Sequence, residues 1–281
     1  MDLTSIIGLV GGAGVVVAGI LSGGNLGDFI DPGSILITIG GTVFAVIASY
    51  PVRMLKNIPK HMKKLIKRDQ HNVEGLVDII VEFSQTARSK GLLALEEKAN
   101  ALEDAFLKKG ILYVVDAMET EKIRESLENE LVNMSSRHEG DIEMYERAAA
   151  YAPSFGMIGT LVGLINMLKN LDLSSGASDA IGINMSIALI TTLYGCLMAN
   201  LIFNPIASKL KIRNEEEIFY KQIIIEGVLG IQSGDNPKLL REKLASLMKE
   251  KKQQAVISGE AGGKEGKEGK GKAPKEKKAK K

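Results

Sequence analysis

Several residue types on which enzymes and metal sites depend are scarce in this chain. Its 281 residues include no tryptophan, three histidines and a single cysteine, Cys196, which lies inside an apolar run. One cysteine can form neither an internal disulfide nor a cysteine-based metal cluster, so we expect a small buried residue. His61, His71 and His138 lie in polar segments without metal-ligand spacing, and we expect them to be solvated. The sequence thus predicts no metal site, no cofactor and no enzymatic centre.

Positive charge is also missing from the first 50 residues, which contain no Lys or Arg. A secretory signal needs positive charge ahead of its apolar core, so the sequence predicts a retained span rather than a cleaved signal. The net charge of the whole chain is only +2. Residues 258–281 alone contribute +5, with nine Lys and four Glu. This balance argues against a nucleic-acid-binding surface.

Four long apolar stretches stand out against this charged background. They are residues 3–21, 30–50, 148–168 and 181–207, and the only charged residue within them is Asp31. A helix needs about 20 apolar residues to cross the hydrocarbon core of a bilayer. The sequence therefore predicts an all-α integral membrane protein with four transmembrane helices.

The basic residues near the ends of these stretches predict the orientation. Seven cations and no acid follow the second stretch, and three more follow the fourth: Arg53, Lys56, Lys60, Lys63, Lys64, Lys67, Arg68, then Lys209, Lys211 and Arg213. Lys and Arg near span ends stay in the cytoplasm. We therefore expect both termini and the 51–147 segment to be cytoplasmic, and two short loops to face outward.

The segments outside the spans have helical patterns. Apolar residues recur at helical spacing in 73–83, in 92–106 and in 119–147, and the last segment enters the third span without a proline. We expect one long helix there, and a fourth span that continues through Arg213 to about Leu229. Asn236 before Pro237 predicts a helix start, with an end near Lys252.

These patterns divide the chain into five parts. They are two spans (1–50), a helical cytoplasmic insert (51–147), two more spans (148–207), C-terminal cytoplasmic helices (208–257) and a tail (258–281). Apart from Pro274, the tail has no apolar side chain larger than that of Ala, so it cannot bury enough surface to order itself.

The middle of the spans has no ionisable side chain, which an ion pathway usually requires. The spans offer hydroxyls and amides instead: Thr38, Thr42, Thr160, Asn166, Asn184, Ser186, Thr191, Thr192, Asn200 and Asn204. If the chain conducts ions, a partner helix must supply the carboxylate. Otherwise these groups only hydrogen-bond within and between helices, and the residue pattern alone favours this second interpretation.

Glycine and proline mark positions of special packing in the spans. Gly8 and Gly12, and Gly159 and Gly163, have the four-residue spacing of close helix contacts. Pro153 and Pro205 lie near the cytoplasmic ends of the third and fourth spans, where each removes a backbone donor and bends the helix. Each proline forms either a static kink or a hinge that couples the membrane to the insert.

Two runs of residues resemble a known family. Residues 152–163 (APSFGMIGTLVG) and 188–195 (ALITTLYG), followed by Ala199-Asn200 and Pro205-Ile206-Ala207, resemble the third- and fourth-span motifs of the flagellar stator subunit family MotA/PomA. Gly40-Gly41-Thr42 resembles its second-span signature, and residues 88–96 (RSKGLLALE) resemble its cytoplasmic torque segment. The resemblance runs in order to about residue 250, and the tail has no counterpart.

The resemblance implies a function and partners. Members of this family form a ring of five copies in the bacterial inner membrane, around two copies of a MotB/PomB subunit. That subunit supplies a membrane aspartate, which would meet the missing-carboxylate problem. Flux of H⁺ or Na⁺ past the aspartate turns the ring, which pushes on a rotor switch protein of the FliG type. Membrane lipid is the remaining partner.

The resemblance also assigns roles to residues. Thr160 and Thr192, with Thr191 as the adjacent candidate, match the hydroxyls that face the partner's aspartate. Pro153 and Pro205 match the prolines tied to conformational change. Arg88 and Glu96 match the rotor-binding charges. If one helix joins those two charges, they lie about two turns apart, with Gly91 as an interruption.

The coupling ion and the nearest relatives leave alternatives open. Thr160 resembles the residue of sodium-type members, but a proton-driven member can carry it too. The runner-up is a TolQ/ExbB-like subunit that energises an outer-membrane process, and such subunits typically have three spans. A channel or transporter acting alone, or a membrane scaffold that conducts nothing, belongs to a different class of protein.

Overall fold

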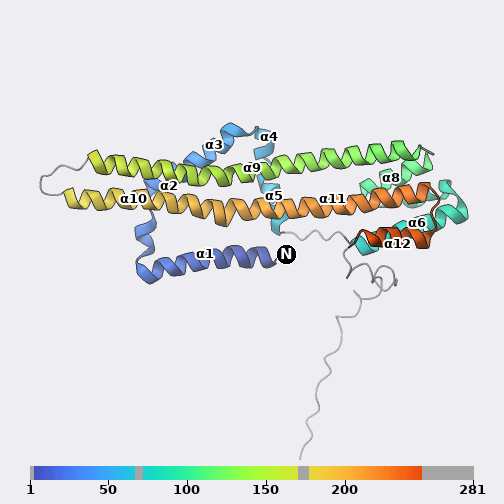
Figure 1. Ribbon diagram of the computed structural model, residues 1–281, viewed down its shortest axis with the longest axis horizontal. Coiled ribbons are helices and arrows are strands. Elements are labelled where there is room, and N and C mark those ends of the chain that lie inside the picture. Colours follow the sequence, from blue (N-terminus) through green and yellow to red (C-terminus); the bar gives the residue numbers. More distant parts are fainter. Residues whose placement is uncertain (1–2, 67–71, 170–176, 249–281) are drawn as a thin grey trace, which may run out of the picture. The chain divides into compact units, whose positions relative to one another are not determined.

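The computed structural model describes residues 3–66, 72–169 and 177–248, and in these ranges the secondary structure is helical. The chain forms two compact units. The first unit comprises Met1–Gln70 and Asn133–Glu216, and the second comprises His71–Val132 and Glu217–Lys281. Figure 1 shows the helices along the chain.

The first unit begins with two apolar helical segments. α1 spans Leu3–Gly23, and a short turn of 3₁₀ helix, η1 (Leu26–Phe29), follows it. The next segment is continuous through α2 (Pro32–Ile35), a π-helical stretch η2 (Leu36–Gly40) and α3 (Gly41–Ser49). The carboxylate of Asp31 accepts a 2.6 Å hydrogen bond from the Ser34 backbone N–H. Asp31 is therefore the N-cap of this segment, which explains an acid beside an apolar run.

Two short helices follow. α4 spans Val52–Leu55 and α5 spans Ile58–Ile66. Met54, Leu55 and Ile58 pack against a buried cluster formed by residues of α9 (Thr120–Lys169) and α11 (Asn204–Gln232). The buried members of this cluster are Ile142, Met144, Tyr145, Ile206 and Ala207.

Long helices carry the rest of the first unit. α9 spans Thr120–Lys169, 50 residues with Pro153 inside it. The predicted single helix from the insert into the third span is thus confirmed. α10 (Ala177–Leu197) continues through a second π-helical stretch, η4 (Met198–Phe203), into α11 (Asn204–Gln232). The predicted extension of the fourth span through Arg213 is also confirmed, although the helix ends at Gln232 rather than at about Leu229.

Three helical segments of the described chain are long and apolar enough to cross a membrane. They lie in Pro32–Ser49, Thr120–Lys169 and Ile181–Gln232. The apolar part of α1, Ile7–Gly23, is shorter, although α1 as a whole has 21 residues. The predicted all-α membrane fold is confirmed, and four spans are consistent with these helices.

The second unit is a helical domain around its own apolar core. Its helices are α6 (Val73–Lys90), η3 (Leu92–Ala94), α7 (Leu95–Asn100), α8 (Ala105–Val115), the outer parts of α9 and α11, and α12 (Pro237–Ser246). Fully buried side chains come from α6, α7, α8, α9, α11 and α12: Ile80, Leu95, Ile111, Ile123, Leu127, Ile223, Ile224 and Leu240.

The residues that end and start these helices are recognisable. Gly91 has φ +84°, a conformation that favours glycine, and it ends α6. Asp104 caps α8 by accepting hydrogen bonds from the N–H groups of Phe106 and Leu107 at 2.8 and 2.9 Å. The 92–106 pattern therefore forms three short elements rather than one helix. Asn236 caps α12 as predicted, accepting from Lys238 N–H at 2.9 Å. The helix ends at Ser246, earlier than the predicted end near Lys252, and the 258–281 tail lies outside the described residues.

Two expectations about single residues are wrong. Cys196 is exposed on this chain. His61 is 7% exposed, because α5 lays it against α9, where its ring nitrogens lie 3.2 Å from the Tyr145 hydroxyl and 3.1 Å from the Asp141 carboxylate. Burial, and the Asp141 charge after it, raise the pKa of Tyr145 to about 12. His138 contacts the Asn214 side chain at 2.9 Å, and His71 lies outside the described residues.

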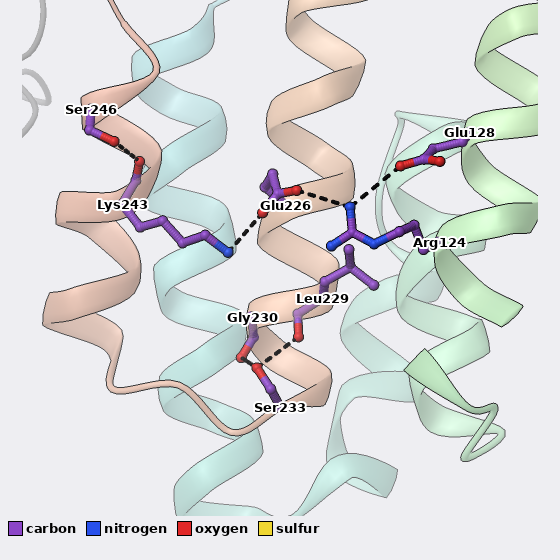
Figure 2. A network of polar contacts seen from close by, with 8 residues as sticks. All are labelled: Arg124, Glu128, Glu226, Leu229, Gly230, Ser233, Lys243 and Ser246. Carbon is purple, nitrogen blue, oxygen red and sulfur yellow. Dashed lines mark hydrogen bonds and ion pairs between the residues drawn. The ribbon is translucent and has the colours of Figure 1, made fainter. Parts of the chain in front are cut away.

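A network of charged side chains joins three helices of the second unit (Figure 2). Glu226 on α11 binds Lys243 of α12 at 2.7 Å and Arg124 of α9 at 3.3 Å. Arg124 also lies 3.4 Å from Glu128. The hydrogen bond from Lys243 is the main cause of a lowered Glu226 pKa, and burial opposes it. Glu226 is therefore the residue that holds two cations on different helices together.

Replacing Glu226 by glutamine is expected to loosen α12. The change keeps the shape but removes the charge that pairs Arg124 and Lys243, whose side chains are 39% and 49% exposed, a loss of about 1–2 kcal/mol for charged hydrogen bonds to a mostly buried carboxylate. Amide hydrogens of α12 should then exchange roughly 5- to 30-fold faster, if α12 opens locally. Glu119→Gln is the control, because the Glu119–Lys122 pair is 75% and 65% exposed and such pairs contribute little.

The same network predicts a dependence on pH. The pKa of Glu226 is lowered below its usual value of 4.5 in the folded chain. Its contribution is therefore fully present above about pH 4.5 and is lost as the pH falls through the folded-state pKa. Exchange in α12 of the wild type should approach that of Glu226→Gln only in acid, and equal rates at pH 7 would contradict the network's role.

Candidate functional site

Glycines bring α9 and α10 into unusually close contact. A Cβ atom on Gly159 would overlap the Thr191 side chain, and one on Gly163 would lie 2.8 Å from the Asn184 carbonyl oxygen. A Cβ on Gly156 would lie 3.1 Å from the backbone of Thr191. From the other side, a Cβ on Gly195 would lie 2.5 Å from the carbonyl oxygen of Ala152. The predicted contact role of Gly159 and Gly163 fits this packing, since small residues let helix backbones approach.

A cluster of threonine hydroxyls lies between these two helices. The hydroxyl oxygens of Thr160 and Thr192 are 2.5 Å apart although the residues are 32 positions apart in the sequence. The Thr160 hydroxyl also lies 3.0 Å from the Ala188 carbonyl and 3.1 Å from the Gly156 carbonyl. Its one proton thus has three acceptors within reach, and its lone pairs can accept a hydrogen bond from, or coordinate, a further group.

Thr191 belongs to a different environment from its neighbour. It is fully buried, and its hydroxyl donates to the Ala188 carbonyl at 2.9 Å. The Thr191 carbonyl accepts a 3.3 Å hydrogen bond from the hydroxyl of Thr38, on η2. Thr160 and Thr192 are only half-buried, whereas Thr191 packs inside the helix bundle.

The two prolines lie at different points of the long helices. Pro153 lies within α9 beside Gly195 of α10, where the helices touch. Pro205 is the second residue of α11, directly after the π-helical stretch η4. That stretch contains Leu201, whose carbonyl Pro205 cannot bond because proline has no N–H. Each proline therefore removes one backbone hydrogen bond from its helix, and Pro153 does so beside the glycine-packed contact.

Arg88 and Glu96 lie in the second unit, and no one helix joins them. Arg88 is in the last turns of α6 and Glu96 is in the first turn of α7, with Gly91 between the two helices. Both side chains are exposed. Neither forms an ion pair with another residue in the described part of the chain, whereas the nearby Lys98 binds Glu82 at 2.6 Å.

Sequence reasoning named the hydroxyls but not their arrangement. Thr38 was only one of ten polar side chains in the spans, and no spacing rule joins it to Thr191, 153 positions away. Phe155 was also missed as a packing residue, although its ring occupies the space where a Cβ on Gly41 would lie. The signal for this contact is the Gly40-Gly41 pair itself, which marks a surface where a large side chain approaches a helix backbone.

Comparison with known sequences and structures places this arrangement in a family. Residues 98–223 match the MotA/TolQ/ExbB proton channel family, and residues 6–91 match the family described as Motility protein A N-terminal. The chain is 44% identical to a protein of Bacillus subtilis called uncharacterized protein YtxD, over 86% of this chain and 89% of that one. It is 40% identical to Motility protein A of Borreliella burgdorferi, over 93% of this chain and 100% of the relative.

The fold gives the same result. The solved structure of the flagellar MotAB stator complex from Bacillus subtilis contains a chain that superposes with a TM-score of 0.82 at 32% identity. The match covers 90% of this chain and 98% of that one. Two matched families, a relative aligned over its whole length and a shared fold agree with one another, and the chain therefore belongs to the Motility protein A (MotA) family.

Proposed function

We propose that this chain is the ring-forming stator subunit of a flagellar motor in the bacterial inner membrane. A MotB-type subunit completes the ion pathway, and ion flux drives rotation against the rotor. The observation that carries the proposal is the pair of half-buried hydroxyls, Thr160 and Thr192, between two glycine-packed helices whose apolar stretches contain no charged side chain. Five copies, with both termini and the 51–147 insert in the cytoplasm, complete the assembly.

The threonine pair would act on a carboxyl group supplied by the partner. A protonated carboxyl donates a hydrogen bond to a hydroxyl oxygen, and a carboxylate accepts a hydrogen bond from a hydroxyl group. The Thr160 hydroxyl lies 3.0 Å from the Ala188 carbonyl and 3.1 Å from the Gly156 carbonyl. It can therefore donate to one of these carbonyls while it accepts from a protonated carboxyl, or turn its proton toward a carboxylate. Its exchange of partners would then follow the charge on the carboxyl, and a bound Na⁺ would use the same oxygens. Thr191, assigned beside them, would contribute through packing.

Pro153 and Pro205 would convert this exchange into motion. Each lies where the helix lacks one backbone hydrogen bond, and Pro153 touches Gly195 of the neighbouring helix. A shift of α9 against α10 at this point changes the direction of the long helices that leave the membrane. Because the glycine contacts leave little free space between the helices, α9 and α10 would move between distinct packed positions and would not slide gradually.

The exposed charges of the second unit would deliver the torque. We expect Arg88→Glu and Glu96→Lys each to cut swimming speed by at least half under load, because each reverses a charge that meets the rotor. Lys90→Glu and Glu97→Lys are the matched controls, since they make the same charge changes at neighbouring exposed positions. Speeds that stay at the wild-type value in both Arg88→Glu and Glu96→Lys, at low and high load, would remove the rotor role.

Deletion of the gene tests the function as a whole. Cells should keep normal flagellar filaments and lose swimming, and the intact gene should restore it. Normal swimming with a leaky envelope or failed nutrient uptake would favour the TolQ/ExbB-like alternative instead. In the rescued cells, swimming speed measured against external sodium at a constant proton gradient decides between H⁺ and Na⁺. A speed independent of sodium removes the sodium alternative.

A further inference from the structure

A stripe of four cations follows the second apolar segment. Arg53, Lys56, Lys60 and Lys63 are three, four and three residues apart, which places them on one face of the nearly continuous α4–α5 segment. All four side chains are exposed. We refer to these four residues as the basic stripe.

The other side of the segment is anchored to the first unit. Met54, Leu55 and Ile58 pack on the buried cluster around Tyr145. His61 adds polar contacts to the same helix α9, at 3.2 Å to the Tyr145 hydroxyl and 3.1 Å to the Asp141 carboxylate. These contacts fix the rotation of α5 about its axis, and the basic stripe therefore faces away from the buried cluster.

The charges of the basic stripe have no counterpart in the described part of the chain. Residues 51–68 contain no Asp or Glu, and none of the four cations forms an ion pair with a residue that the structure describes. Exposed apolar side chains lie beside them, with Val52 64% and Met62 43% exposed. These residues come directly after an apolar helix that ends at Ser49. Cations beside exposed apolar side chains are typical of a segment at the membrane surface, where lipid headgroups lie next to acyl chains.

We propose that the basic stripe binds the phosphate groups of anionic lipids in the leaflet that it faces, and that α5 is oriented for this purpose by the His61 anchor. This adds a specific lipid surface to the stator subunit and does not depend on its action on a rotor. Lysines at such a surface attract anionic headgroups, and the attraction weakens with salt. The acidic surface of another protein is the competing occupant, and the experiment below separates the two.

Spin-labelled lipids provide the test. The full chain, purified with its MotB-type partner, is reconstituted into phosphatidylcholine bilayers with spin-labelled phosphatidylglycerol or spin-labelled phosphatidylcholine. We expect the protein-bound fraction to favour phosphatidylglycerol by about fivefold at low salt, the attraction expected of one basic residue near the surface. Lys56→Gln/Lys60→Gln/Lys63→Gln should bring this preference close to one. That variant keeps four cations in residues 51–68, which preserve the orientation of the spans.

Two control variants test whether the charge and its position matter. Lys56→Arg/Lys60→Arg/Lys63→Arg should keep the preference, because it retains the charge. Lys90→Gln/Lys108→Gln/Lys238→Gln removes the same charge from the second unit and should leave the preference unchanged. An equal loss in this control, or an unchanged preference in the glutamine variant of the stripe, overturns the proposal. If the glutamine variant of the basic stripe keeps its lipid preference and its purified complex dissociates, the proposal of lipid binding is overturned in favour of a protein partner.

Discussion

Replacement of Thr160 by valine is expected to slow ion flux severely while the stator complex still assembles. Valine keeps the shape of threonine but cannot donate to the Ala188 carbonyl or pair with the Thr192 hydroxyl, at 3.0 and 2.5 Å. A polar partner left unpaired in such a site costs about 1–3 kcal/mol, which slows passage by roughly 5- to 150-fold if that cost falls on the transport barrier. Cells carrying the variant should make filaments and fail to swim.

Flux can be measured directly with the purified complex in liposomes that contain a dye sensitive to the transported ion. Thr160→Ser restores the hydroxyl and should recover most of the flux, whereas Thr192→Val should resemble Thr160→Val. Thr191→Val is the matched control, because the Thr191 hydroxyl only donates within its own helix. Normal flux in Thr160→Val and Thr192→Val together would exclude these hydroxyls from the pathway, and loss of flux in Thr191→Val alone would assign the role to Thr191.

Replacement of Gly159 by valine should strongly destabilise the first unit. Even a single Cβ at this position overlaps the side chain of Thr191, and a branched side chain would push α9 away from α10. Overpacking of this kind typically costs about 1–3 kcal/mol, and more where backbone must move. We expect the amount of complex recovered from membranes to fall at least tenfold, with a lower melting temperature for what remains.

Gly182→Val provides the comparison for this second effect. Gly182 lies on α10 with nothing within 4 Å of its added Cβ, so the same substitution meets open space there. Its yield should equal that of the wild type. Wild-type yield and flux in Gly159→Val would show that the two helices are not in contact at this point.

Much of the architecture followed from local patterns. The length of α9 was predictable because apolar residues keep one stripe from residue 119 onward and no proline lies between residue 119 and Pro153. The start of α12 was predictable because Asn236 and Pro237 each favour a helix start for its own physical reason. Gly91 only suggested the break after Arg88. In a sequence, a glycine that adopts a positive φ and ends a helix looks the same as a glycine that is tolerated inside a helix.

The arrangement of the site was less accessible for a physical reason. Nothing in the sequence sets the 2.5 Å contact of Thr160 with Thr192, because it depends on which faces of α9 and α10 pack together. The burial of His61 was mispredicted because cationic neighbours suggested solvent, while Ile58 and Met54 on the same short helices already required a packed face. Roles carried by the family resemblance, such as those of Pro153 and Arg88, remain predictions for experiment.

The π-helical stretches η2 and η4 give this protein two places where a membrane-spanning helix can lose a residue. A π turn holds one residue more than an α turn, so removing any one residue of Leu36–Gly40 would let the helix close into regular α geometry. The later residues would then keep nearly the same rotation about the axis, because the turn closes as its extra residue is removed, and Gly41 would stay beside the Phe155 ring. A one-residue deletion within Met198–Phe203 would leave Pro205 on the same face of its helix in the same way. In a regular α-helical part of a span, the same deletion turns every later residue by about 100° around the axis. Members of the family should therefore tolerate single-residue gaps in the two π-helical stretches far better than elsewhere in the spans.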